Sequence, residues 1–215
     1  MLLNFAPSRR QRRGFTLVEM IVVVAIMALL AALAAPSMFS WVRNNKIRTV
    51  SDSLQNGLRT AQAEASRRSR QVVFSLTDDK PVKTADAYTA KDNGNNWAIT
   101  TVALLGSDSA VSGASFIEAG ILRDVGANVV IEGPASICFS SIGRLAKNLD
   151  PGITGADCEL PTADKPVRYD IKLTDSVDGD RALRVTVDLG GQVRMCDPAR
   201  TLSTSQPDGC AATTP

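Results

Sequence analysis

The 215-residue sequence contains no histidine. Without an imidazole the chain cannot build Ser-His-Asp or Cys-His nucleophilic sites, histidine-dependent zinc sites or histidine-ligated haem. Aromatic residues make up only 5% of the chain, which argues against a stacking platform for single-stranded nucleic acid. The sequence also has no glycine-rich phosphate-binding loop, and no acidic pair flanked by other catalytic residue types. It therefore predicts no enzyme, no cofactor and no metal site.

Positive charge is concentrated at the N-terminus. Residues 1–14 carry four arginines and no acid, so the remainder holds 24 − 4 = 20 basic against 22 acidic side chains. A mildly acidic body is a poor nonspecific polyanion binder, because such binding depends on many cations that neutralise phosphates. Nucleic acid is therefore an unlikely partner, and the basic head is a local signal.

A long apolar segment follows the basic head. Residues 15–35 read FTLVEMIVVVAIMALLAALAA, with Thr16 and Glu19 as the polar interruptions. At about 1.5 Å per helical residue this run matches a bilayer core of roughly 30 Å. The flanking arginines favour a cytoplasmic N-terminus, which would place the rest of the chain outside.

A cleaved secretory signal is the first alternative for this segment. Arg12 and Arg13 loosely resemble a twin-arginine signal, and residues 32–34 form an A-x-A site. Glu19 argues against this alternative, because a carboxylate in an apolar segment is costly and a disposable signal does not need one. The apolar run is also long for a cleaved segment. A plain membrane anchor is the second alternative.

The residues Arg13-Gly14-Phe15-Thr16-Leu17-Val18-Glu19 resemble the class III signal of type IV prepilins and type II secretion pseudopilins. The resemblance implies that prepilin peptidase cuts between Gly14 and Phe15 and methylates the new Phe15 amine. Glu19 is the fifth residue after that cut and Pro36 the twenty-second, as in the family. In a filament of low dielectric, Glu19 would pair with the Phe15 amine of a neighbouring subunit, so that both charges are compensated.

The resemblance also implies a cellular role. The chain is expected to be a single-pass protein of the bacterial inner membrane, with a cytoplasmic N-terminus and a periplasmic C-terminal domain. Its partners would be other major and minor pilins or pseudopilins, bound through the N-terminal helix, together with the peptidase, the inner-membrane assembly platform and the lipid bilayer. It would prime or cap a type IV pilus or a type II secretion pseudopilus.

Helical periodicity continues beyond Pro36, where the missing backbone donor is expected to kink or loosen the helix. Phe39 and Trp41 lie just beyond the proline. They suit either the membrane–water interface on the outer side of the spanned membrane or packing against the globular domain. Charged residues mark the opposite, solvated face: Arg43, Lys46, Arg48, Asp52, Arg59, Glu64 and Arg67. An apolar stripe recurs at steps of three and four: Ile47, Val50, Leu54, Leu58, Ala61 and Ala65.

The fold class predicted from these patterns is α+β and pilin-like. A long N-terminal helix, transmembrane in its first half and amphipathic in its second, should pack on a C-terminal antiparallel β-sheet domain. The predicted segments are a cleaved leader at 1–14, a transmembrane segment at 15–36, an amphipathic helix at 37–70 and a β-rich domain at 71–215.

Period-two and β-branched runs predict the strands of that domain. They lie at 71–76, 97–105, 128–132, 136–141, 167–173, 183–189 and 192–196. The Gly190-Gly191 pair predicts a hairpin turn between the last two strands. Polar segments at 78–96 and about 148–166 are predicted to be surface loops.

Four cysteines, an exported location and no histidine predict disulfides rather than a metal site. Three connectivities are open. Pairing of neighbours, Cys138 with Cys158 and Cys196 with Cys210, is favoured because each enclosed loop is short.

The acidic run 175–180 admits a calcium site as a minor alternative, but its spacing fails the EF-hand pattern and favours a turn. Within the family, the final hairpin resembles the GspH/FimT/FimU group of minor pilins. FimT-type members capture DNA with a Gly-Arg-x-Arg turn, whereas this chain has Gly191-Gln192-Val193-Arg194. A pilus-borne DNA receptor that uses Arg194 and Arg200 is therefore the alternative function. Three further arginines could converge with them in space: Arg144, Arg168 and Arg184.

Overall fold

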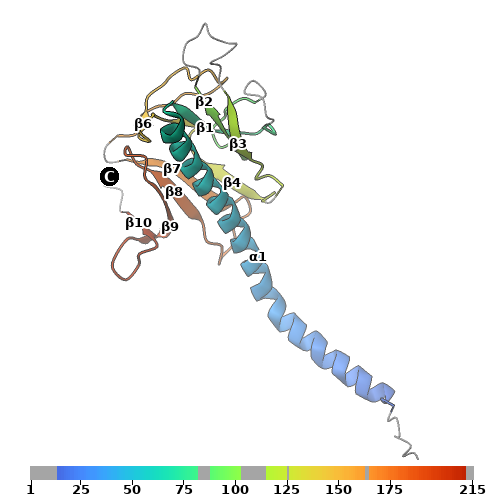
Figure 1. Cartoon of the computed structure of the whole chain (residues 1–215). Helices are drawn as coiled ribbons and strands as arrows, with labels where there is room; N and C mark the ends of the chain where they lie inside the picture. The colour runs from blue at the N-terminus through green and yellow to red at the C-terminus, as the bar shows by residue number, and fades with distance from the viewer. Residues whose placement is uncertain (1–13, 82–87, 103–114, 125, 163–164, 212–215) are drawn as a thin grey trace, which may run out of the picture. The chain divides into compact units, whose positions relative to one another are not determined.

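The computed structural model describes residues 14–81, 88–102, 115–124, 126–162 and 165–211. Residues 1–13, most of the predicted leader, lie outside this range. The chain divides into two units, residues 1–41 and residues 42–215. Its elements, labelled in Figure 1, are α1 (Leu17–Arg68), β1 (Val72–Thr77), β2 (Asn96–Thr101), β3 (Phe116–Gly120), β4 (Val129–Glu132), β5 (Ser136–Phe139), β6 (Leu145–Ala146), β7 (Val167–Leu173), β8 (Leu183–Val187), β9 (Val193–Thr201) and β10 (Gly209–Cys210).

Helix α1 has 52 residues and continues without interruption through Pro36. Its second half buries the predicted apolar stripe: the six residues from Ile47 to Ala65 are at most 1% exposed. All seven charged residues assigned to the opposite face are exposed or partly exposed. Arg43, however, lies four residues before Ile47, on the same helix face as the stripe, and its side chain contacts the segment between β7 and β8.

The C-terminal end of α1 is fixed by local chemistry. Ser69 adopts a left-handed φ of 50°, and the Arg70 N–H donates to the Ala65 carbonyl at 3.2 Å, which satisfies one of the helix's last carbonyls. Glu64 accepts hydrogen bonds from Arg67 and Arg68. These bonds lower the pKa of Glu64 to about 2.

The strands form two five-stranded sheets. The first has the order β3-β2-β1-β5-β6 and the second β10-β9-β8-β7-β4. The chain enters the second sheet with β4, returns to the first with β5 and β6, and completes the second with β7 to β10. All strand pairs are antiparallel except β9 with β10, which is parallel and irregular. The α+β class, a long helix on a mainly antiparallel β domain, is confirmed.

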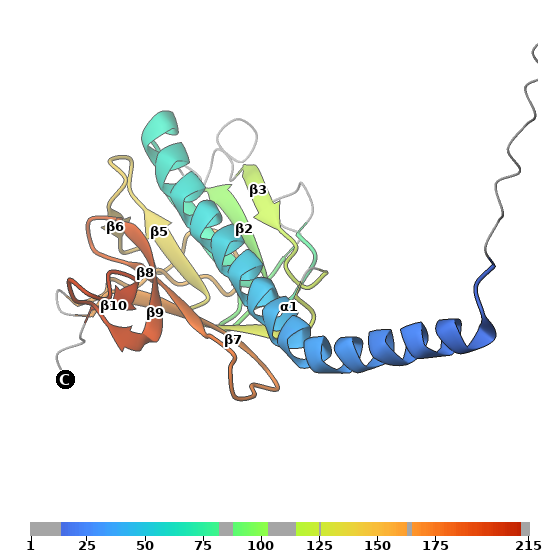
Figure 2. The same cartoon turned by 90° about the horizontal axis from the view of Figure 1, so that it is seen from below.

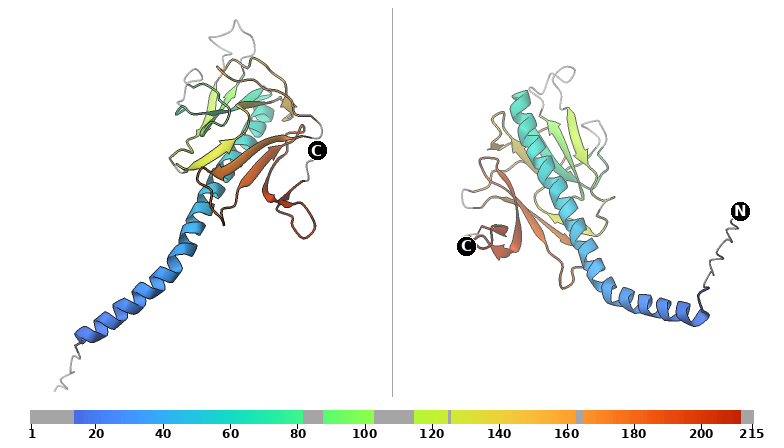
Figure 3. Two further views of the ribbon diagram at one scale, coloured as in Figure 1. Left: turned by 180° about the vertical axis from the view of Figure 1, so that it is seen from behind. Right: turned by 60° about the horizontal axis from the view of Figure 1, so that its bottom comes forward.

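The second half of α1 lies across both sheets, as Figures 2 and 3 show from two directions. One apolar cluster joins the helix stripe to Phe74 and Ile137 of the first sheet and to Tyr169 and Val185 of the second. Within this cluster the Phe74 ring contacts two other aromatic rings. Its centroid lies 5.7 Å from that of Trp97 and 6.3 Å from that of Tyr169. The two sheets and the helix therefore share one core.

A second apolar cluster covers the other face of the first sheet. Val73, Ala98 and Cys138 point away from the helix and are buried by segments that were predicted as surface loops. Those segments contribute Tyr88, Ala90, Ile153, Ala156 and Cys158. The surface-loop prediction is therefore wrong for parts of 78–96 and 148–166. Because these segments cover the outer face of the first sheet, β1, β2 and β5 are buried on both faces.

Strand boundaries match most predicted segments within a few residues, and β7 matches both ends. The predicted 97–105 strand ends at Thr101, and its last residues, 103–105, lie outside the described range. Three strands were not predicted: β3, β6 and β10. Strand β9 runs past Cys196 to Thr201 despite Pro198; β10 pairs with it only at Asp197 and Thr201, so no ladder hydrogen bond is needed from the proline.

The Gly190-Gly191 turn connects β8 and β9 as predicted. Gly191 has φ +87°, and its N–H donates to the Asp188 carbonyl at 2.9 Å. The turn lies against the Gly143 carbonyl, to which the Gln62 amide of α1 also donates at 3.0 Å. Nearby, the Leu145 N–H donates to the Leu189 carbonyl at 3.2 Å. Helix and both sheets thus meet at this turn.

We expect Gly191→Ala to destabilise the globular unit by about 2 kcal/mol or more, because a left-handed φ disfavours a Cβ. The added Cβ would also overlap the Gly143 carbonyl oxygen. Chemical unfolding of the full-length protein in detergent measures the difference. Gly190→Ala is the matched control: its Cβ would meet only the flexible Asp188 side chain, at 3.2 Å. Equal midpoints for the two variants would contradict the prediction.

Candidate functional site

The described chain begins at the predicted processing position. An added Cβ on Gly14 would meet nothing within 4 Å, and Phe15 is 77% exposed. The Thr16 hydroxyl accepts a hydrogen bond from the Glu19 N–H at 3.2 Å, and the Thr16 carbonyl accepts one from Met20 at 3.2 Å. Thr16 therefore caps α1. Glu19 occupies the first turn, where the helix dipole favours a negative charge.

Thr16 has a role that the sequence analysis missed. The run Thr16-Leu17-Val18-Glu19 fits the S/T-x-x-E signature of a helix N-terminus, so the signal was present. The cap makes the helix begin at Leu17. Glu19 is then the third residue of the helix, and Phe15 lies just before it.

The first part of α1 presents apolar side chains that the described residues leave exposed. From Phe15 to Val42 the large apolar side chains are 43–77% exposed. Over 18 residues the helix reaches a mean hydropathy of 2.8, and it is long and apolar enough to cross a membrane. Such a surface is unfavourable in water and needs lipid or other apolar helices around it.

The two candidate DNA-contacting arginines are not equivalent. Arg194 is exposed on β9, directly opposite Thr186 of β8. Arg200 is held by two carboxylates, Asp208 at 2.8 Å and Asp197 at 3.6 Å. The two arginines are six residues apart along the strand, about 20 Å, so they do not form a joint phosphate clamp.

The other candidate arginines are also dispersed. Arg184 pairs with Asp170 through two hydrogen bonds, at 2.6 and 3.1 Å. Arg168 lies opposite Thr186 on the side away from Arg194. Arg144 lies in the exposed turn between β5 and β6. The structure therefore brings only Arg168 and Arg194 to the same cross-strand row.

The acidic run between β7 and β8 forms a turn around Arg43. The Arg43 guanidinium donates to both carboxylate oxygens of Asp180, at 2.9 and 2.6 Å, and to the Asp175 carbonyl. The Asp180 carboxylate also accepts the Val177 N–H at 2.8 Å. The hydrogen bond from Arg43 is the main cause that lowers the pKa of Asp180. Among the described residues no group of acidic or cysteine side chains could hold a metal ion.

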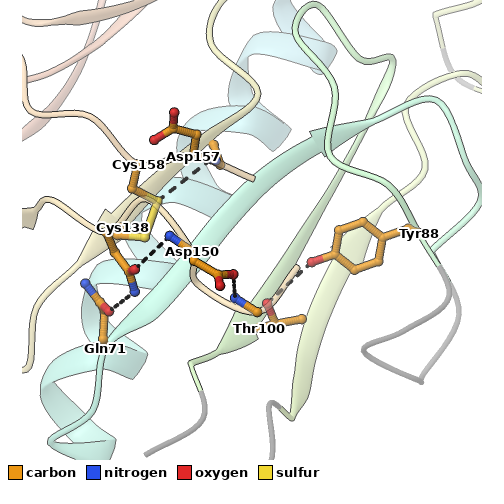
Figure 4. The surroundings of a disulfide bond; sticks show 10 residues. Gln71, Tyr88, Thr100, Cys138, Asp150, Asp157 and Cys158 are labelled. Carbon is orange, nitrogen blue, oxygen red and sulfur yellow. Dashed lines mark hydrogen bonds between the residues drawn. A yellow bond between two sulfur atoms is a disulfide. The ribbon is translucent and has the colours of Figure 1, made fainter. Parts of the chain in front are cut away.

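The four cysteines form the two neighbouring pairs that were favoured. Cys138 joins Cys158, and Cys196 joins Cys210, with Cα atoms 5.5 and 4.9 Å apart. Figure 4 shows the first bond, with Asp150 and Asp157 drawn near it. This bond anchors the segment that contains Cys158 to β5.

Comparison with known proteins decides the class of the N-terminus. Residues 9–35 match the prokaryotic N-terminal methylation motif. The prepilin-type resemblance is thereby confirmed. The matched region includes the predicted Gly14–Phe15 junction and Glu19, and it ends one residue before Pro36. No curated protein matches the sequence.

Two crystal forms of the type IV minor pilin FimU from Pseudomonas aeruginosa (strain PAO1) are similar in structure. Sequence identities are 16% and 14%, and TM-scores are 0.47 and 0.41. The similarity covers 79% and 76% of this chain and 98% of the FimU chain in each.

Proposed function

We propose that this protein is a minor pilin or pseudopilin, a non-enzymatic subunit that primes or caps a type IV pilus or a type II secretion pseudopilus. The observation that supports this most directly is the combination of the N-terminal methylation motif with an apolar helix surface that stays exposed in the described part of the chain. A cleaved signal would discard that surface. A subunit of a helical bundle needs it.

In this proposal, prepilin peptidase cuts after Gly14 on the cytoplasmic side and methylates Phe15. The mature protein stays in the inner membrane with its β domain in the periplasm. An assembly platform then extracts it into a filament, where Glu19 pairs with the Phe15 amine of a neighbour. Pro36 loosens the helix between the membrane segment and the globular unit.

A pilus-borne DNA receptor is the alternative. It ranks lower, because Arg200 is already neutralised by two acidic side chains and a single exposed arginine gives only a weak, salt-sensitive phosphate contact.

Two measurements on the native host test the proposal. Intact mass and N-terminal sequencing of the membrane protein should show methylated Phe15, and a deletion strain should lose surface pili or secreted substrate. An N-terminus at Ala35 or Pro36 would mean conventional export. Unchanged filaments and secretion in the deletion strain would reject an assembly role, and DNA binding by the purified full-length protein would then favour the alternative.

A further inference from the structure

The globular unit begins on α1 without apolar burial. Among the helix side chains that the structure describes, the first buried apolar one is Ile47, whereas Val42 is 43% exposed. Arg43 lies one turn before Ile47 on the same face, where another apolar residue would continue the stripe. Polar contacts therefore replace core packing at the residues where the helix enters the globular unit.

These contacts are made by Arg43 and Asn44 with residues 175–181, a set we call the latch. Asp180 is the centre of the latch: its side chain is only 3% exposed although it carries a charge. Both of its oxygens accept from the Arg43 guanidinium, the fork-like geometry that makes arginine–carboxylate pairs strong and directional. Because the same carboxylate accepts the Val177 N–H, the turn and the helix are held by one group.

Asn44 completes the latch with both ends of its side-chain amide. Its Nδ2 donates to the Gly179 carbonyl at 3.1 Å, and its Oδ1 accepts the Arg181 N–H at 2.8 Å. The left-handed φ of Gly179, +96°, turns this backbone toward the helix. Two consecutive helix residues are thus bound to one loop by five hydrogen bonds.

We propose that Arg43 is a positioning residue for filament assembly, because the latch fixes the residue at which α1 becomes free of the globular unit. This inference rests on the proposed function. A fixed exit residue sets the number of helical residues between Glu19 and the globular unit, and so allows the Glu19 contact and the globular contacts of a subunit to form together.

The polar character of the latch suits this role. An apolar residue at position 43 would join the exposed apolar surface of residues 15–42 to the buried stripe that starts at Ile47. No polar residue on that face would then separate the two apolar surfaces. A charged arginine–aspartate pair, here a buried carboxylate with a partly exposed guanidinium, cannot move into a lipid or apolar helix environment without a large cost. The latch therefore stops the apolar segment at a defined residue.

The test compares Arg43→Ala with Arg48→Ala in the full-length protein. Arg48 is the matched control, since it lies five residues further along the helix and, within the described residues, its ion pair is an exposed one with Asp52 at 3.7 Å. In detergent, we expect Arg43→Ala to raise amide hydrogen exchange of residues 42–46 by about tenfold, as charged hydrogen bonds are lost. Exchange of residues 50–65 should stay unchanged. Asp180→Asn should behave like Arg43→Ala.

The second readout is incorporation into filaments in the native host. We expect Arg43→Ala to lower it about two- to fivefold, because fewer subunits have an ordered helix exit at any time. Arg43→Lys should recover part of the loss, since an ammonium keeps the charge but not the fork. Unchanged exchange in Arg43→Ala, or faster exchange with wild-type incorporation, overturns the inference. Wild-type incorporation of a Glu19→Gln variant would instead reject the proposed function, whatever the latch does.

Discussion

Replacing Glu19 with glutamine should leave the protein processed and membrane-bound but reduce its incorporation into filaments by about a hundredfold. Breaking a buried ion pair by removing one charge costs about 3–5 kcal/mol, because the other charge stays buried without compensation. A cost of about 3 kcal/mol corresponds to a factor of about a hundred in an equilibrium constant. The measurement is the ratio of filament-bound to membrane-bound protein by immunoblotting of sheared and membrane fractions.

The Glu19 variant keeps the helix start intact. The cap is made by the Thr16 oxygens and the backbone of residues 19 and 20, so the glutamine preserves it. Glu118→Gln, which changes an exposed acid on β3, is the control for a general charge effect. Equal incorporation of the Glu19 and Glu118 variants would show that the carboxylate at position 19 does not pair between subunits.

Local patterns predicted those parts of the fold that depend on near neighbours in the sequence. The stripe from Ile47 to Ala65 repeats every three or four residues, which a helix on a core requires. The Gly190-Gly191 turn joins adjacent strands, and its own residues determine its geometry. The neighbouring cysteine pairs belong to the same group, since each closes a short loop.

The two-sheet arrangement was not predictable in the same way. Strand β4 does not pair with β3 or β5, its neighbours in sequence, but with β7, about forty residues later. No local sequence pattern specifies this pairing. The burial of Tyr88, Ile153 and Ala156 depends on the same tertiary arrangement, because each residue lies in a segment whose composition is otherwise polar. Sequence composition alone assigned these segments to the surface.

In the candidate site, too, residues close in sequence could be predicted and residues distant in sequence could not. Gly14, Phe15 and Glu19 are close in sequence and form a recognisable motif. Arg43 and Asp180 are 137 residues apart, and charge alone placed Arg43 on the solvated face. A polar residue at an apolar-stripe position was the available signal, since such a position needs a specific partner when it is buried.

Removing the Cys138–Cys158 bond should destabilise the globular unit far more than removing the Cys196–Cys210 bond. Loop closure alone gives similar values of about 3 kcal/mol for sequence separations of 20 and 14. The difference lies in what each bond holds. Cys138 and Cys158 are buried in the cluster that covers the outer face of the first sheet, so their loss exposes Val73 and Ala98 to water.

The second bond holds only the C-terminal tail. Beyond β9 the described tail contributes a two-residue strand, β10, and exposed residues from 202 to 208. This tail can separate from the sheet while the main core stays intact, because neither Cys196 nor Cys210 belongs to that core. Loss of this bond should therefore appear as local opening rather than as global unfolding.

The double variants Cys138→Ala/Cys158→Ala and Cys196→Ala/Cys210→Ala separate these effects. The first should lower the melting temperature of the full-length protein in detergent by about 6–12 °C, since about 3 kcal/mol corresponds to 2–4 °C per kcal/mol in a domain of this size. The second should shift it by only a few degrees but make residues 202–209 sensitive to protease. Buried Trp97 reports on the core by its fluorescence. Equal melting shifts in the two double variants would mean that the 148–162 segment contributes no more to stability than the C-terminal tail does.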